Sequence, residues 1–180
     1  SRLVGSEMCI RDSDNAATTE ISEKVIAEMM KAMKVNYGNP SSTHSHGRNS
    51  KAILELSRKN IAEKFNVNPK EIIFTSGGTE SNNMIIKTVV IAQNIERIIS
   101  TKIEHKAVLN SIESIAKERG VTILFLDVDE YGLPNKQQLT EHLENSDEKT
   151  LVSLMHINNE TGTMIDLEEF GKICKSNNAL

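Results

Sequence analysis

The sequence has few aromatic residues, few cysteines and no long apolar run. Aromatic side chains make up 3% of its 180 residues and tryptophan is absent, which argues against a module that stacks bases on aromatic rings. Its two cysteines, Cys9 and Cys174, give neither a disulfide framework nor a metal-binding spacing. This favours a reducing compartment, and we expect the cytoplasm. No run of residues is long enough to span a membrane, and we expect no signal peptide.

The balance of charge and apolar residues narrows the possible functions further. The formal net charge is −4, so the chain lacks the basic surface that direct nucleic-acid binding requires. Its hydrophobic fraction is 38%, whereas roughly 45–50%, counted with glycine, is typical of globular proteins. The chain can bury a core, but we expect that core to be incomplete.

The first thirteen residues differ from the rest of the chain. Residues 1–13 show neither helical nor strand periodicity, and their four charges cancel. Our hypothesis is that they form a foreign leader that takes no part in the fold. We predict that residues 14–180 are the amino-terminal part of a larger domain, truncated where a further strand should begin.

From residue 20 onward, the apolar pattern predicts an α/β protein. Two helices, at 20–34 and 45–65, come first, and a methionine-rich stripe on the former (Met29, Met30, Met33) is expected to lie in the core. Short apolar runs then alternate with helical patterns. The expected strands are 71–75, 97–101, 121–126 and 151–156, and the expected helices are 80–93, 104–119, 135–144 and 166–176. Such alternation is typical of a mostly parallel sheet flanked by helices.

A glycine pair between the first expected strand and its helix indicates an anion site. Gly77 and Gly78 are followed by Thr79, whose hydroxyl adds a donor. The backbone N–H groups at a helix start favour a phosphate. The alternative is a plain turn with a threonine cap. The spacing fits neither the dinucleotide fingerprint nor the triphosphate loop, so a nucleotide-binding module is the weaker reading.

Polar residues at two further strand ends should reach the same edge of the sheet. His105 opens the helix after strand 97–101, and Asn158 and Asn159 follow strand 151–156. Open α/β sheets bind ligands at the carboxyl ends of their strands. His105 could stack on a flat cofactor and transfer protons, or it could be an ordinary surface histidine. The asparagines could bind a ligand or simply form a turn.

Taken in order, five segments resemble the group I cysteine desulfurases (NifS/IscS type) of the class V aminotransferase superfamily. They are DNAATT (14–19), YGNPSSTHSHGR (37–48), EIIFTSGGTESNN (71–83), EHKAVLNS (104–111) and SLMHINNETGTM (153–164). The resemblance implies the large domain of a pyridoxal-phosphate enzyme of fold type I, here incomplete, that works as a homodimer. Such enzymes convert L-cysteine to L-alanine and hold the sulfur as a persulfide. The sulfur goes to an iron–sulfur scaffold or another acceptor protein, or to tRNA thiolation.

The same resemblance assigns roles to four residues. It implies that Gly78 and Thr79 hold the cofactor phosphate, that His105 stacks on the pyridine ring as a catalytic residue, and that Asn159 binds near the ring hydroxyl. The Schiff-base lysine and the persulfide-forming cysteine of the family both lie beyond the position of Leu180. We therefore predict that the 180-residue chain alone is inactive. The alternatives are another class V lyase or transaminase, or a non-catalytic truncated paralogue.

Overall fold

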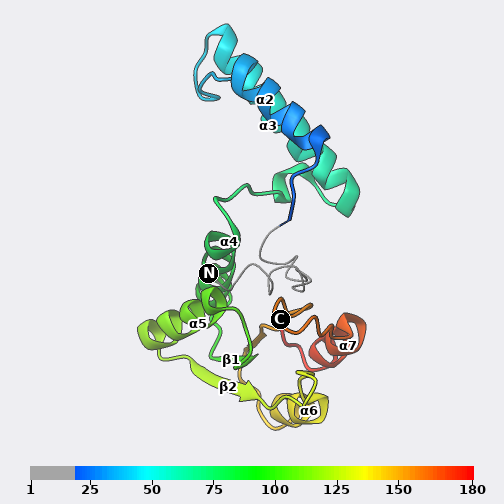
Figure 1. Ribbon diagram of the computed structural model, residues 1–180. Helices are drawn as coiled ribbons and strands as arrows, with labels where there is room; N and C mark the ends of the chain where they lie inside the picture. The colour runs from blue at the N-terminus through cyan, green and yellow to red at the C-terminus, as the bar shows by residue number, and fades with distance from the viewer. Residues whose placement is uncertain (1–18) are drawn as a thin grey trace, which may run out of the picture. The chain divides into compact units, whose positions relative to one another are not determined.

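The computed structural model describes residues 19–180, and the hypothetical leader at residues 1–13 lies outside them. The chain divides into two compact units at Phe74 and Thr75. We call residues 19–74 the helical unit and residues 75–180 the sheet unit, and we describe each by itself (Figure 1).

The helical unit consists of two long helices and one short turn of helix. Helix α2 is Glu23–Val35, α3 is Ser45–Phe65, and the 3-10 helix η1 is Pro69–Glu71. The imidazole of His44 caps α3 by accepting a hydrogen bond from the N–H of Gly47 at 3.3 Å. Both long helices begin and end within a few residues of the predicted ranges.

The expected burial of the methionine stripe is wrong. Met29, Met30 and Met33 are 46–65% exposed, and no residue of α2 is buried. The periodicity of α2 correctly predicts an apolar face, but within this unit that face has no closely packed partner. Helical spacing shows which residues lie together on a surface, not whether another element covers that surface.

The loop between α2 and α3 folds back tightly on the first turns of α3. The hydroxyl of Ser50 donates to the carbonyl of Asn36 at 2.8 Å, and the ring of His46 stacks on Tyr37 with centroids 5.3 Å apart. A Cβ atom at Gly38 would collide with the backbone of His46 in α3, and one at Gly47 would collide with the carbonyl oxygens of Asn39 and Ser42 in the loop. Both glycines are therefore required by the close approach of backbone to backbone.

The sheet unit is built on three parallel strands. They are β1 (Arg97–Thr101), β2 (Thr122–Leu126) and β3 (Thr150–Val152), in the order β2-β1-β3. In register, Ile98 of the central strand lies between Ile123 and Leu151. All five residues of β1 are buried, as expected for a strand covered on both faces.

Helices cover the two faces of the sheet separately (Figure 1). Helices α4 (Gly78–Ala92) and α5 (Lys106–Arg119) pack around Ile98, whereas α6 (Lys136–Glu144) and α7 (Leu167–Ser176) pack around Ile99. Side chains of successive strand residues point to opposite faces. These two adjacent isoleucines therefore each serve one of the two cores, and the expected α/β architecture is confirmed.

Three details differ from the sequence-based expectation. Residues 72–75, expected as a strand, follow η1 without strand pairing, and Ile73 is 63% exposed. Strand β3 ends at Val152, four residues before its predicted end. The helical pattern of residues 80–93 predicts that Met84, Ile85 and Thr88 face the core, but the buried residues of α4 are Ile86 and Val90.

The last residue of the chain already has strand-like bonding. The N–H of Leu180 donates to the carbonyl of Thr150 at 3.0 Å, and the N–H of Val152 donates to the carbonyl of Leu180 at 2.7 Å. This is the parallel pattern, on the side of β3 away from β1. Within residues 19–180, no helix is both long and apolar enough to cross a membrane.

Candidate functional site

The glycine turn that precedes α4 leaves the start of this helix open. No side chain caps it, and the first intrahelical bond runs from the N–H of Ser81 to the carbonyl of Gly77 at 3.1 Å. The N–H groups of Gly78 and Thr79 therefore have no partner within the helix. A Cβ atom built on Gly77 or Gly78 would meet no heavy atom within 4 Å. The turn thus offers donors and open space to an anion.

Three side-chain hydrogen bonds stabilise this turn. The carboxylate of Glu80 accepts hydrogen bonds from the N–H and the hydroxyl of Ser76, both at 2.6 Å. On the other side, the hydroxyls of Thr75 and Ser81 lie 2.7 Å apart. The two bonds from Ser76 hold the pKa of Glu80 below its ordinary value. The ionised carboxylate of Glu80 is therefore the form that binds Ser76 more strongly.

We predict that acid weakens the two hydrogen bonds between Ser76 and Glu80 by protonating the Glu80 carboxylate. A lowered pKa in the folded state means that the stabilisation is present above the ordinary carboxyl pKa and is lost as the pH falls through the lowered value. The NMR shift of the Ser76 amide should report this titration, and Glu80→Gln should abolish it. In the control Glu113→Gln, which alters an exposed residue of α5, the titration should persist. A Ser76 amide that does not respond to acid would contradict the prediction.

His105 is positioned by its own hydrogen bond to helix α5. It follows β1 and caps α5, because its Nδ1 accepts the N–H of Ala107 at 3.0 Å. With Nδ1 acting as an acceptor, the neutral imidazole carries its proton on Nε2. The ring is exposed. Only its Nε2 edge is therefore free to exchange protons with a ligand.

A buried carboxyl group lies directly before His105. Glu104 is only 8% exposed, and its Oε1 atom has no hydrogen-bond partner among the described residues. Burial raises the pKa of Glu104, while hydrogen bonds from the backbone of Met155 and His105 oppose that rise. The carboxyl group of Glu104 thus lies at the start of α5, close enough to the segment after β3 for the Met155 backbone to lower its pKa.

The two asparagines after β3 have different environments, a point that the sequence left open. Residues 158–163 form a tight turn, in which Gly162 has a φ of 73° and its N–H donates to the carbonyl of Asn158. Asn158 is buried at 7% exposure, whereas Asn159 is exposed. Asn159 is thus available to a ligand and Asn158 is not.

His105 and Asn159 line one cavity at the carboxyl edge of the sheet. Its volume is about 300 Å³, and its other lining residues are Ile103, Glu104, Lys106 and Glu160. Gly78 and Thr79 do not line this cavity. The structure therefore places two of the four predicted site residues, His105 and Asn159, in one cavity.

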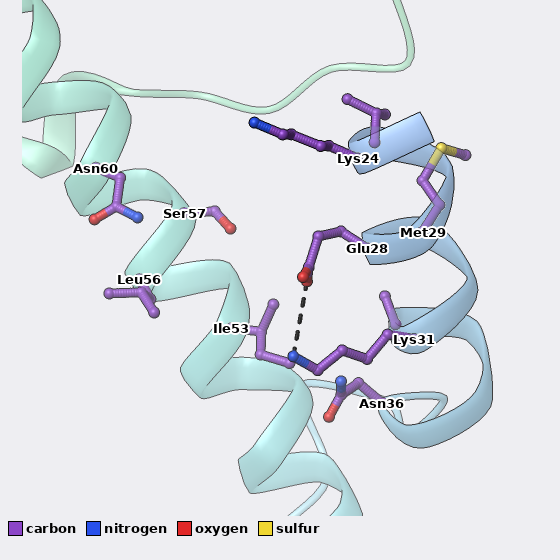
Figure 2. A pocket seen from close by; sticks show the side chains of 11 residues that line it. Lys24, Glu28, Met29, Lys31, Asn36, Ile53, Leu56, Ser57 and Asn60 are labelled. Carbon is purple, nitrogen blue, oxygen red and sulfur yellow. Dashed lines mark ion pairs between the residues drawn. The ribbon is translucent and has the colours of Figure 1, made fainter. Parts of the chain in front are cut away.

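Other features of the described residues fit a functional site less well. A cavity of about 710 Å³ lies between α2 and α3 and includes the Glu28–Lys31 ion pair at 3.9 Å (Figure 2), but it contains none of the predicted site residues. Cys174 is half-buried, and burial raises the pKa of its thiol, as expected for a structural cysteine rather than a nucleophile. Within residues 19–180, no three His, Cys, Asp or Glu side chains form a metal-binding group.

Comparison with known proteins covers nearly the whole chain. A family model described as aminotransferase class-V matches residues 13–180. A protein of Trachipleistophora hominis named "Cysteine desulfurase, mitosomal" is 42% identical over 93% of this chain and 38% of its own length. A solved structure titled "NIFS-LIKE PROTEIN" is 36% identical with a TM-score of 0.84, covering 92% of this chain and 45% of that one. Another, titled "SspA in complex with cysteine", is 29% identical with a TM-score of 0.81, covering 91% and 47%. The chain thus spans less than half the length of these relatives.

Proposed function

Because the chain belongs to the class-V aminotransferase family, we propose that it is the amino-terminal part of a cysteine desulfurase. This enzyme would use pyridoxal phosphate to remove sulfur from L-cysteine and release L-alanine. The relatives with that name, and the similar protein solved in complex with cysteine, support this substrate.

One structural observation carries the proposal. His105 and Asn159 come from the loops after two neighbouring parallel strands, β1 and β3, and line the same cavity. The carboxyl edge of such a sheet is where α/β enzymes bind ligands. A flat ring and an exposed amide in one cavity suit a flat heteroaromatic cofactor with a polar substituent.

The residues present fit the cofactor. Pyridoxal phosphate, when bound, acts as an electron sink for the substrate amino acid. We propose that the N–H groups of Gly78 and Thr79, with the Thr79 hydroxyl, hold its phosphate in the open space at the start of α4. His105 would stack on the ring and exchange a proton at Nε2, since Nδ1 is engaged with Ala107. The amide of Asn159 would orient the ring through its hydroxyl substituent.

We further propose that the two remaining catalytic groups come from sequence beyond this chain. Sulfur removal needs a thiolate that attacks the substrate sulfur, and the half-buried Cys174 is unsuited to that role because burial raises its pKa. The family resemblance likewise places the Schiff-base lysine beyond the position of Leu180. The 180-residue chain alone is therefore expected to release no alanine from cysteine.

The proposal is tested with the longer protein that contains this chain. We expect it to retain pyridoxal phosphate and to form equal amounts of alanine and enzyme-bound sulfur from L-cysteine. The variant Thr79→Val removes a hydrogen bond to a charged phosphate, worth about 1.5–3 kcal/mol, and should weaken cofactor binding about ten- to hundredfold. The measurement is cofactor titration followed by absorbance.

The matched control is Thr88→Val, an exposed position on the same helix. This variant should bind the cofactor as well as the parent does. If the parent binds the cofactor but forms no alanine from cysteine, the chain comes from a lyase or transaminase of the same family. If it binds no cofactor at all, the non-catalytic alternative is correct.

We also propose that the enzyme is a cytoplasmic homodimer that passes sulfur to an iron–sulfur scaffold or another acceptor protein. The exposed apolar face of α2 supports association, because surfaces of this kind usually mark an interface. The scarcity of cysteine supports a reducing compartment. One relative is named as mitosomal, so cell fractionation is the appropriate test of the location.

A further inference from the structure

Asn158 joins two segments that each carry one side chain of the cavity. Its Nδ2 donates to the carbonyl of Ile103, at 3.3 Å, just before His105. Its Oδ1 accepts the N–H groups of Glu160 and Thr161 at 2.8 and 3.1 Å, just after Asn159. The side chain thus holds both the start of α5 and the turn after β3.

The backbone of Asn158 is equally engaged. Its N–H donates to the carbonyl of Thr163 at 2.9 Å, and its carbonyl accepts from Gly162 at 2.8 Å. The residue is 7% exposed, so water cannot readily replace these bonds. Asn158 is therefore held by hydrogen bonds from both its backbone and its side chain. The next residue, Asn159, lines the cavity.

We propose that Asn158 is a positioning residue that sets the place of Asn159 relative to His105. This proposal rests on the proposed function, because it assigns a purpose to the cavity that these two residues share. Asn158 itself is not among the residues that line the cavity. It acts through the Ile103 carbonyl on one side and through the Glu160 and Thr161 amides on the other.

The isosteric variant Asn158→Asp gives the sharpest test. It keeps the oxygen that accepts from Glu160 and Thr161, but it places a carboxylate oxygen against the Ile103 carbonyl. The turn should therefore stay folded while its connection to the start of α5 is lost. Asn158→Ala removes both connections. Asn145→Asp is the charge-matched control, at an exposed position that ends α6.

The first readout needs no cofactor. In the longer protein without cofactor, the imidazole NMR resonances of His105 should shift in Asn158→Asp and Asn158→Ala, but not in Asn145→Asp. The amides of Glu160 and Thr161 should exchange faster in Asn158→Ala than in Asn158→Asp. Unchanged His105 resonances in both Asn158 variants would overturn the proposal, whether or not the protein is a desulfurase.

The second readout uses the cofactor-bound protein. A misplacement of about 1 Å at a reacting centre can cost about a hundredfold in rate. We therefore expect Asn158→Asp to lower kcat for cysteine ten- to hundredfold and to displace the cofactor absorption band. An unchanged band and unchanged kcat would overturn the proposal. A parent protein that binds cofactor but does not desulfurate cysteine would refute only the proposed function.

Discussion

Replacing Ile112 with alanine is expected to destabilise the sheet unit by about 2–5 kcal/mol. Ile112 lies on α5, is 0% exposed and packs in the same core cluster as Ile98 and Ile115. Removing its branched side chain loses the transfer free energy of the buried carbons and leaves a cavity that a close-packed core fills poorly. Because domains are stable by only about 5–15 kcal/mol, the loss is a large fraction of the total. Urea unfolding followed by circular dichroism measures it.

The matched control for this substitution is Ile85→Ala in the same unit. Ile85 lies on α4 beside the buried Ile86, but is itself 56% exposed. Alanine also has the higher helix propensity, so we expect a change of about 0.5 kcal/mol or less. Equal losses at Ile112 and Ile85 would show that the two-sided core described above is wrong.

Gly47→Ala is expected to disrupt the start of α3. A Cβ at this position would collide with the carbonyl oxygens of Asn39 and Ser42, which belong to a turn that cannot yield as a flexible side chain could. Overpacking of this kind typically costs about 1–3 kcal/mol, occasionally more. The result should be faster amide exchange in the first two turns of α3 and loss of the Tyr37–His46 ring stacking, both observable by NMR.

The contrasting control is Gly171→Ala, a change of the same chemistry in the middle of α7. There the new Cβ would meet no heavy atom within 4 Å. Alanine should therefore stabilise α7 by about 0.5–1 kcal/mol through its helix propensity. If both substitutions slow amide exchange in their own helices, the backbone contact at Gly47 is not as tight as the structure indicates.

Periodicity predicted the elements of the sheet unit well and the packing of the helical unit poorly. On α5, Val108, Ile112 and Ile115 recur at helical spacing and are all buried, because β-strands lie directly beneath them. On α2, Met29 and Met33 recur just as regularly and are exposed. The pattern is a property of one element, whereas burial depends on a partner that the pattern does not identify.

The sequence indicates candidate residues for the site but not the residues that hold them in place. His105 and Asn159 carry chemistry that stands out at strand ends, and the structure places both on one cavity, while their roles stay predictions. Asn158 did not stand out as a support, because its role depends on a bond to Ile103, 55 positions earlier in the chain. Local sequence contains no signal for a contact of that range.

The order of the strands has a consequence for how the protein emerges from the ribosome. The central strand β1 is made before either neighbour. The face of Ile98 is covered by α5 about fifteen residues later. The face of Ile99 is covered first by Leu139 of α6, about forty residues later, and completely only with Phe170 of α7, about seventy residues later. At synthesis rates of 5–20 residues per second, that longer interval is roughly 4–14 s. One face of the nascent sheet is thus shielded almost at once, while the other stays incompletely covered for seconds.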